Sequence, residues 1–263
     1  MNFSSANGAV IAAVVRPHVA LVTINRPAAR NAVNGDVALG LERAIIAAES
    51  ASDIWAVILT GAGTQAFSAG ADLKEVSLGR MNALYTVHGG FAGFVHAQRT
   101  KPWIAAVNGF AVAGGFEIAL ACDMIVASED SSFGLPEVRR GLMAAAGGLY
   151  RLPRALPRQL ASELIATGAT ISGRRCSELG VVNRISTPGQ AVAAAIELAA
   201  EICANAPIAV RESLQVTRQS FDLTDEELRR LSEAAQERVM QTEDFQEGPK
   251  AFIEKREPVW QGR

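Results

Sequence analysis

The stretch AVAGGFEIALACD, residues 111–123, places two adjacent glycines and one carboxylate, Glu117, in an otherwise apolar run. A strand-like segment ends at Gly114 and Gly115, and a helix that is apolar on every face begins there. Because glycine has no side chain, a ligand can closely approach the unpaired backbone N–H groups of such a turn. Two interpretations follow, an oxyanion or anion-binding turn and a tight strand-to-helix turn without a ligand.

Glu117 falls in the first turn of this predicted helix, where the helix dipole favours a carboxylate. The apolar residues around it predict burial, which raises a carboxyl pKa and suits the group to proton transfer. A second glutamate, Glu137, lies twenty positions further along, beyond a predicted strand at 124–128. We expect both carboxyl groups at one end of a sheet, as a general acid and base acting on water. The alternatives are a capping carboxylate and a surface ion pair with a neighbouring arginine.

Two further loops of small residues share features with this turn. The segment FSAGADLKE (67–75) offers backbone N–H groups at Ala69, Gly70 and Ala71, and AAAGGLYRL (144–152) places another glycine pair before a helix. Three such loops in one chain favour close contact between backbone and ligand over three unrelated turns.

Strand and helix patterns alternate along the first two thirds of the chain. Apolar segments at 9–15 and 19–25 predict a β-hairpin. The remaining predicted elements are buried strands at 55–61, 102–109, 124–128 and 181–186 and helices at 35–50 and 158–167. This order predicts an α/β fold, and the recurrence of strands that end in glycine loops favours a repeated ββα unit.

The pattern changes at about residue 190, after which only helices are predicted. Thr224 and Glu227 have the spacing of a capping box. We therefore divide the chain into residues 1–189, a core that carries the active site, and 190–263, a helical region. Its amphipathic helices must bury one face against the core or against another subunit.

Composition excludes several classes of protein. The chain has 263 residues and a formal net charge of −2, which argues against a nucleic-acid partner. The longest charge-free runs have 15 residues, whereas a membrane span needs about 20. The N-terminus lacks the positively charged start of a signal peptide. The cysteines form no CxxC pair, and the three histidines are scattered, so we predict a cytoplasmic protein with reduced thiols, no membrane contact and no metal site.

The sequence also lacks the motifs of several other enzyme classes. The sequence contains no GxSxG, HExxH or GxxxxGK[ST] motif. The segment GAGTQA (61–66) is similar to a shortened dinucleotide fingerprint, but a loop follows it where that fingerprint requires a helix. A dinucleotide-dependent oxidoreductase is therefore disfavoured.

Five segments together resemble the motifs of one family, in the expected order along nearly the whole chain. They are INRPAARNAV (24–33), AFSAGADLKE (66–75), KPWIAAVNGFAVAGGFEIALACD (101–123), FGLPEVRRGL (133–142) and EGPKAFIEKREP (247–258). The chain thereby resembles the crotonase superfamily, the enoyl-CoA hydratases and isomerases. The resemblance implies a crotonase-type spiral of ββα units with a helical C-terminal trimerisation region, assembled as a homotrimer or as a hexamer built from two trimers.

The same resemblance implies roles for individual residues. Backbone N–H groups of Ala69 and Gly114 match the oxyanion hole, and Glu117 and Glu137 match the two catalytic carboxylates. Coenzyme A is part of the acyl-CoA substrate, and no separate cofactor or metal is implied. The positions that match the coenzyme A site are Ala28, Arg30, Ala69, Gly70, Ala71, Asp72 and Leu73, together with Phe252 and Lys255, which can reach the nucleotide bound by a neighbouring subunit.

Retention of both glutamates favours an enoyl-CoA hydratase, a lyase of acyl-CoA and fatty acid metabolism. In the family the residue matching Glu117 activates water and the one matching Glu137 protonates Cα, and simple isomerases are expected to lack the former carboxylate. Ala113 replaces a glycine of many members. The segment 141–157 lacks the proline and TQ of typical short-chain hydratases and resembles the carnitinyl-CoA dehydratase branch. A carnitinyl-CoA dehydratase-like or other specialised hydratase, an isomerase and a non-catalytic acyl-CoA-binding protein stay open as alternatives.

The segment 77–95 is expected to wall the acyl pocket. Its larger side chains indicate an apolar acyl tail, with ordinary core packing as the alternative for each of them: Met81, Leu84, Tyr85, Phe91 and Phe94.

Overall fold

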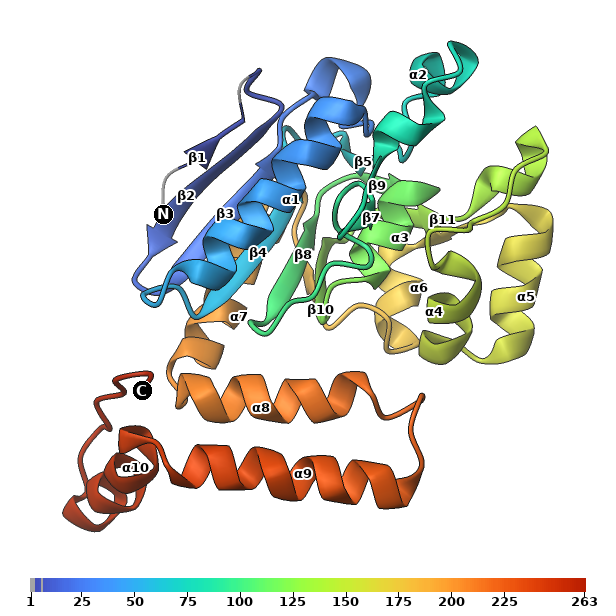
Figure 1. Cartoon of the computed structure of the whole chain (residues 1–263). Helices are drawn as coiled ribbons and strands as arrows, with labels where there is room; N and C mark the ends of the chain where they lie inside the picture. The colour runs from blue at the N-terminus through green and yellow to red at the C-terminus, as the bar shows by residue number, and fades with distance from the viewer. Residues whose placement is uncertain (1–2, 6) are drawn as a thin grey trace.

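The computed structural model describes residues 3–5 and 7–263, and in this part of the chain two sheets organise the fold (Figure 1). The larger sheet has the order β1-β2-β3-β4-β8-β10-β13 and the smaller one β12-β11-β9-β5. The larger sheet contains β1 (Phe3–Ser4), β2 (Val10–Arg16), β3 (Val19–Ile24), β4 (Ala56–Gly61), β8 (Trp103–Val107), β10 (Met124–Ser128) and β13 (Arg184–Ser186). The smaller sheet contains β5 (Ala66–Ser68), β9 (Phe110–Val112), β11 (Ser132–Gly134) and β12 (Thr170–Ser172). A separate hairpin pairs β6 (Tyr85–Thr86) with β7 (Gly90–Phe91).

Helices connect and cover these strands. The α-helices are α1 (Gly35–Ser50), α2 (Leu73–Ser77), α3 (Gly114–Leu120), α4 (Gly148–Ala155), α5 (Arg158–Thr167), α6 (Gly173–Glu178), α7 (Ala191–Cys203), α8 (Pro207–Arg218), α9 (Asp225–Met240) and α10 (Glu243–Glu254). Three short 3₁₀ helices are η1 (Pro27–Ala29), η2 (Met81–Leu84) and η3 (Pro136–Arg140).

A ββα unit repeats along the chain, as predicted. Each unit adds a long strand to the larger sheet and a short strand to the smaller one before a helix follows: β4, β5 and α2, then β8, β9 and α3, then β10, β11 and η3. The long strands pair in parallel, and so do the short strands. Because parallel neighbours end at the same edge, the loops after β5, β9 and β11 lie side by side. These loops carry the small-residue segment 69–72, the turn at 113–117 and Glu137.

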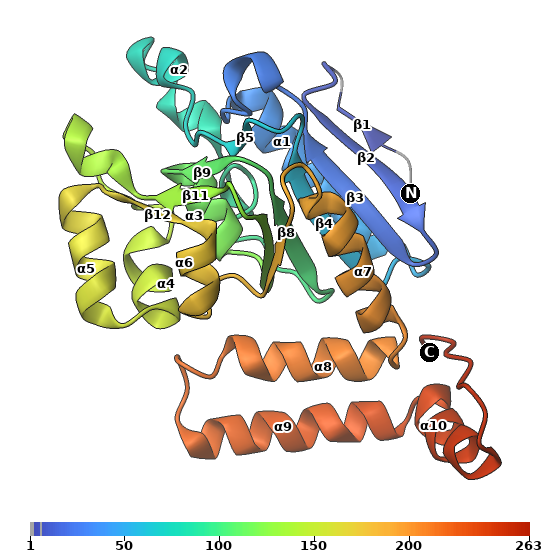
Figure 2. The same cartoon turned by 180° about the vertical axis from the view of Figure 1, so that it is seen from behind.

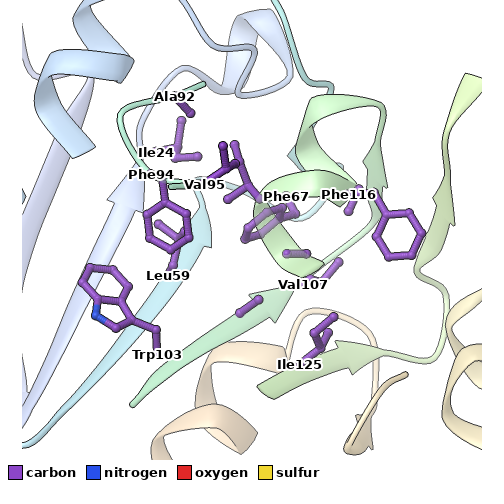
Figure 3. Close-up of a cluster of buried hydrophobic side chains, with 14 of the residues drawn as sticks. Ile24, Leu59, Phe67, Ala92, Phe94, Val95, Trp103, Val107, Phe116 and Ile125 are labelled. Carbon is purple, nitrogen blue, oxygen red and sulfur yellow. The ribbon is translucent and has the colours of Figure 1, made fainter. Parts of the chain in front are cut away.

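The main core lies between the larger sheet, α1 and the smaller sheet (Figure 3). Phe94 meets Trp103 edge to face with ring centroids 5.2 Å apart, and Phe116 lies 5.1 Å from Phe133. All four rings are fully buried, and each aromatic side chain buries a large apolar area. This packing holds α3, and with it Glu117, rigidly against the sheets.

A second, smaller core lies under α7 on the opposite face of the larger sheet (Figure 2). Its helix face consists of Ala191, Ala195, Leu198 and Ala199. The small alanine side chains allow this helix to approach Ile58 and Ile104 of the sheet closely. α7 therefore completes the core, whereas α8, α9 and α10 extend beyond it as a helical arm (Figures 1 and 2).

The helical arm attaches to the core through polar contacts. The Arg218 guanidinium of α8 lies 2.7 Å from an Asp123 oxygen and also donates to the backbone carbonyls of Arg99 and Lys101. The chain after α10 folds back, because Asp244 accepts hydrogen bonds from the backbone N–H groups of Gln261 and Gly262.

Several local predictions are confirmed, whereas the strand predicted at 181–186 is longer than the observed one. The hairpin, the bounds 35–50 of α1 and the Thr224–Glu227 capping box all agree with the sequence analysis. In the segment 181–186 only Arg184–Ser186 forms a strand, since Val181 and Val182 turn into the main core instead. Within the described ranges no single helix is long and apolar enough to cross a membrane. The helices α7 and α8 pass the test of length and composition together, but the chain bends by 107° between them.

Lys101 is a buried cation with a structural role. Its side chain is 1% exposed, and its ammonium group donates to the backbone carbonyls of Ala48 and Ala51 at the end of α1. Burial lowers its pKa to about 8. Carbonyl groups at a helix C-terminus need donors, and a cation there also complements the helix dipole.

Candidate active site

The loops after β5 and β9 pack directly against each other because both contain glycine. Gly70 has φ +81°, and a Cβ there would lie 2.6 Å from the Gly114 nitrogen. A Cβ on Gly115 would lie 2.1 Å from the Ser68 carbonyl oxygen, and one on Gly114 would meet the Phe91 ring. Neighbouring protein atoms therefore fill the space beside these Cα atoms, and the prediction that a ligand approaches the backbone N–H groups stays a prediction. The function of the glycines is close backbone packing, which leaves the N–H groups to be considered separately.

One predicted oxyanion donor needs correction. The Ala69 N–H group donates to the Arg30 carbonyl oxygen at 3.0 Å, so it is not available to a substrate. Two residues further on, the N–H of Ala71 has no hydrogen-bond partner among the described residues, and neither has the N–H of Gly114. Because Gly70 contacts Gly114, these two free donors belong to adjoining segments of backbone. The structure thus supports Gly114 and replaces Ala69 by Ala71.

The loop that carries Ala71 is braced from one side. Val33 donates to the Gly70 carbonyl at 2.7 Å and accepts from the Asp72 N–H at 2.9 Å. The Ser68 hydroxyl donates to the Asn31 carbonyl at 2.8 Å. Since alternate backbone groups of an extended segment point in opposite directions, the bonds of Gly70 and Asp72 to Val33 turn the Ala71 N–H away from that neighbour. The donor is therefore preorganised by its neighbours.

The turn into α3 adopts a strained conformation. Ala113, which stands where many family members have glycine, has φ +52° and ψ −132°. A residue with a Cβ pays for positive φ in steric energy, and such strain concentrates at functional sites. Ala113 keeps this conformation while its N–H donates to Gly134 at 2.9 Å, which links the loops after β9 and β11.

Glu117 is 3% exposed and has a fixed orientation. Its Oε1 atom accepts a hydrogen bond of 2.8 Å from the Gly148 N–H at the start of α4. Its pKa is raised to about 7, mainly by burial and also by the charge of Glu137, while hydrogen bonds from the backbone of Gly148 and Ala146 and the charge of Arg151 act in the opposite direction. A carboxyl group with this pKa can exchange protons at neutral pH.

Glu137 lies on η3, and both of its carboxyl oxygens are buried without a hydrogen-bond partner in the described part of the chain. Burial raises its pKa, and the charge of Arg140 partly opposes the shift. Leu135 precedes η3 and lies beside the Glu117 carboxylate, since a Cβ on Gly148 would be 2.9 Å from the Leu135 side chain and 3.1 Å from Oε1 of Glu117. The segments that carry the two glutamates therefore adjoin, and the charge of Glu137 contributes to the raised pKa of Glu117. The alternative of a surface ion pair with Arg139 is wrong, because that side chain donates to the Thr167 carbonyl.

The positions predicted for coenzyme A fall in two places. Ala28 and Arg30 adjoin the loop 69–73 through the bond between Ala69 and Arg30. The Asp72 side chain caps α2 and lies 3.0 Å from the Arg26 guanidinium, so its direct role is structural. Leu73 is 51% exposed beside it.

Phe252 and Lys255 lie elsewhere. In both views α10, which carries Phe252, is at the opposite end of the molecule from α2 and α3 (Figures 1 and 2). Phe252 is 86% exposed, and Lys255 ends α10 with a left-handed φ of +54°. These residues do not meet Glu117 of their own chain.

The expected acyl wall is only partly confirmed by its burial. Leu84 and Phe94 are fully buried and Phe91 is 3% exposed, so these three side chains belong to the core. Met81 and Tyr85 keep 41% and 44% of their surface exposed. The apolar character assigned to the segment 77–95 thus comes mostly from side chains that are buried in the protein.

Sequence reasoning missed other residues that the fold brings to this place. Gly148 holds Glu117, although the glycine pair of that loop was noted only as a close-contact motif. Arg151 donates to the carbonyls of Ala146 at 3.1 Å and Val95 at 2.6 Å and so fixes the loop before α4. Nothing in the sequence alone indicates which carbonyl groups a buried arginine will reach.

Comparison with known proteins identifies the family. A sequence model described as enoyl-CoA hydratase/isomerase matches residues 15–263. The chain belongs to the enoyl-CoA hydratase/isomerase family. The mevalonyl-coenzyme A hydratase of Aspergillus fumigatus is 38% identical over 250 residues, which cover 93% of this chain and 92% of that protein. The carnitinyl-CoA dehydratase of Salmonella arizonae is 38% identical over 246 residues, covering 92% of this chain and 94% of the relative.

Solved structures of this enoyl-CoA hydratase/isomerase family have the same fold. The crystal structure of an enoyl-CoA hydratase from Mycobacterium tuberculosis superposes with a TM-score of 0.92 at 41% identity, covering 97% of this chain and 99% of the other. The predicted fold class and the resemblance to the crotonase superfamily are confirmed by these matches.

Proposed function

We propose that the protein is an enoyl-CoA hydratase, which reversibly adds water across the 2,3 double bond of an acyl-CoA thioester. The observation that carries this proposal is a pair of glutamates, Glu117 and Glu137, whose carboxyl groups are buried on adjoining segments. They lie in a member of the enoyl-CoA hydratase/isomerase family, beside two adjoining backbone N–H groups that have no hydrogen-bond partner in the described part of the chain.

The two free donors suit the thioester carbonyl. Attack of water at Cβ moves negative charge onto the thioester oxygen, giving an enolate-like intermediate. The N–H groups of Ala71 and Gly114 would stabilise that charge without reorganising, because packing of the Gly70 loop against α3 already holds both segments. Loss of one such donor typically costs ~10²–10³ in rate.

The two carboxyl groups suit the movement of water and proton. Gly148 holds Oε1 of Glu117, so Oε2 is the atom that would take a proton from water as the water attacks Cβ. Glu137, in its protonated form, would give its proton to Cα, and burial raises its pKa, which favours that form relative to an exposed carboxyl group. Dehydration would use the same groups in reverse.

Assembly into a homotrimer, or a hexamer of two trimers, is part of the proposal. Ala28, Arg30 and the loop 69–73 would bind coenzyme A in their own subunit. Phe252 and Lys255 lie at the far end of the chain (Figure 1) and would reach the nucleotide only at a neighbouring subunit. The 86% exposure of Phe252 supports a contact partner outside its own chain.

A spectrophotometric assay on crotonyl-CoA tests the reaction, because hydration removes the absorbance of the conjugated enoyl thioester. We expect rapid loss of absorbance with the wild-type protein and a loss slower by about 10²–10⁴ with Glu117→Gln. Absence of turnover in a protein that binds coenzyme A thioesters would contradict simple enoyl-CoA hydration.

A specialised acyl-CoA hydratase is the second candidate. It is supported by the relatives named for mevalonyl-coenzyme A and carnitinyl-CoA, and by Tyr150, one of the residues in place of the TQ of typical short-chain hydratases. Crotonobetainyl-CoA is the next substrate to assay, and a 3-enoyl-CoA tests isomerase activity. A specialised hydratase would use the same two glutamates, so its difference from a simple enoyl-CoA hydratase would lie in the acyl pocket.

A further inference from the structure

The chain contains two tyrosines, and both are near the proposed active site. Tyr85 and Tyr150 are 44% and 43% exposed. Burial and then the charge of Glu117 raise the pKa of the Tyr85 phenol. Its ring meets Phe91 edge to face at 5.6 Å, and Phe91 in turn contacts Gly114, one of the two oxyanion donors. Tyr85 is thus connected to the donor side of the site.

Tyr150 is connected to the other side of the proposed site, the side that holds Glu117. A Cβ on Gly147 would lie 3.1 Å from the Tyr150 hydroxyl, and the next residue, Gly148, holds the Glu117 carboxylate. The Tyr150 hydroxyl lies 3.3 Å from Nε2 of His96.

His96 links the two sides. A Cβ on Gly90 would lie 2.5 Å from its Nδ1 atom, and Gly90 pairs in the β6–β7 hairpin next to the pair Tyr85–Phe91. A continuous set of contacts therefore runs from Gly114 through the hairpin to His96 and on to Tyr150. The residues along these contacts include three with polar groups, the hydroxyls of Tyr85 and Tyr150 and the imidazole of His96.

The Tyr150–His96 pair has hydrogen-bonding capacity to spare. If the hydroxyl donates to Nε2, its oxygen can still accept a bond; if Nε2–H donates, the hydroxyl can still donate one. A substrate hydroxyl, which both donates and accepts, satisfies either arrangement. Partial burial and then the charge of Arg151 lower the pKa of His96, so the imidazole is neutral at neutral pH.

The electrostatics at Tyr150 disfavour a cationic acyl group. The guanidinium carbons of Arg151 and Arg154 lie 5.1 and 5.7 Å from the ring centroid. Arg154 is paired with Asp222 at 2.7 Å, whereas Arg151 donates only to backbone carbonyls. The aromatic face that could bind a quaternary ammonium already interacts with these cations, and a further positive charge would be repelled.

We propose that Tyr85, His96 and Tyr150 form a polar subsite for the acyl chain, which selects an uncharged 2-enoyl-CoA carrying a hydroxyl group beyond Cβ. This inference rests on the proposed hydratase function and assigns its substrate class. It differs from both the apolar tail predicted from the sequence and a trimethylammonium group.

The test compares two thioesters of equal length that differ in one terminal group. We expect kcat/KM for 5-hydroxypent-2-enoyl-CoA to exceed that for hex-2-enoyl-CoA by about tenfold, the effect of one hydrogen bond to a partly exposed pair. Crotonobetainyl-CoA should be hydrated less efficiently than either. Equal or reversed preference for the alkyl chain, or a best rate with crotonobetainyl-CoA, would overturn the subsite.

Variants assign the preference to these side chains. Tyr150→Phe keeps the ring and removes the hydroxyl, and it should lower the ratio of the two kcat/KM values to near one. His88→Gln is the matched control, since His88 is an exposed histidine on the turn of the same hairpin and should leave the ratio unchanged. An unaltered ratio in Tyr150→Phe would contradict the assignment.

A binding experiment separates failure of the subsite from failure of the proposed reaction. The saturated thioesters 5-hydroxypentanoyl-CoA and hexanoyl-CoA need no catalysis, and calorimetry gives Kd for each. Tighter binding of the hydroxylated thioester without turnover of any enoyl-CoA would support the subsite and refute the hydratase. Hydration of hex-2-enoyl-CoA with equal Kd values would support the hydratase and refute the subsite.

Discussion

The regions around Glu117 and Glu137 bring the same chemical group to the site in different ways. Glu117 lies on a regular helix at 3% exposure, and Gly148 fixes one of its oxygens. Glu137 lies on a short 3₁₀ turn, and neither of its oxygens has a partner among the described residues. A carboxyl group with one fixed oxygen presents the other in a single direction, which suits a base that orients water. A carboxyl group with two unbonded oxygens can rotate and deliver a proton.

Replacing each carboxylate by its amide gives the largest expected effect. Glu117→Gln and Glu137→Gln should each lower kcat on the preferred enoyl-CoA by about 10²–10⁴, the usual contribution of a general acid or base. Stopped assays measure kcat, and calorimetry with a saturated acyl-CoA should give Kd values close to that of the wild type. A parallel loss of binding would mean that the carboxylates hold the fold rather than act on water.

Disturbing only the support of Glu117 should have a smaller effect. In Gly148→Ala the new Cβ would lie 3.1 Å from Oε1 of Glu117 and 2.9 Å from the Leu135 side chain, so the carboxylate must shift. We expect kcat to fall about tenfold with little change in KM, since small displacements of a catalytic group are costly. The control is Gly248→Ala, where the nearest atom beyond the helix is at an ordinary 3.4 Å on Trp260. Equal kcat values in the two variants would show that the bond from Gly148 does not matter.

The pH dependence should distinguish the two groups. Glu117 must be ionised to accept a proton, and its pKa is raised to about 7, so kcat/KM should decline as pH falls through that value. Glu137 must be protonated to donate, so activity should also decline on the alkaline side and give a bell-shaped profile. Because the groups interact, the two limbs report the pair. Because the Glu117 pKa is about 7, kcat/KM should rise between about pH 5 and pH 7. A flat profile over this range would contradict the role of Glu117 as base.

Ionisation of Glu117 should lower the stability of the folded protein, although it is needed for activity. The Glu117 pKa is about 7 in the folded protein and near the ordinary 4.5 in the unfolded chain, so the folded state binds more protons between these values. Stability is therefore lost as pH rises from 4.5 to 7, and Glu117→Gln should be more stable than the wild type above pH 7, by on the order of 3 kcal/mol. Urea unfolding at acidic and alkaline pH measures this difference. A variant that is less stable at alkaline pH would show that the carboxylate contributes favourable contacts beyond those described.

The smallest effect concerns Glu137 alone. Burial raises the pKa of Glu137 and the charge of Arg140 opposes that rise, so Arg140→Gln should move the alkaline limb of the pH profile to higher pH. Arg140→Lys keeps the charge and should leave that limb in place. Movement of the acidic limb instead would reverse the assignment of the two carboxylates.

Much of the fold and of the site could be predicted because the signals are local. Helical periodicity set the bounds of α1, and alternation within short apolar runs indicated β2 and β3. Glu117 stood out because a lone carboxylate in an apolar helix is costly. These inferences need no knowledge of residues distant in the sequence.

The predictions that failed concern features that depend on contacts between residues distant in the sequence. Ala69 and Ala71 are chemically identical and share one loop, and only the bond from Ala69 to Arg30 removes the former as a donor. The strands β6 and β7 have two residues each, too few to show a period. Consequently the sequence could not show that Phe91 enters the core while its cross-strand partner Tyr85 stays exposed.

The scarcity of lysine makes the proposed assembly open to chemical cross-linking. The sequence has four lysines, and Lys101 is withdrawn into the end of α1, which leaves Lys74, Lys250 and Lys255 exposed to amine-directed reagents. Lys74 lies on α2, and the other two lie at or beside the end of α10, at the opposite end of the molecule (Figures 1 and 2). A short reagent that joins Lys74 to Lys255 therefore has to join two copies of the chain. Peptide mass spectrometry of that single product would report the subunit contact directly, without a crystal.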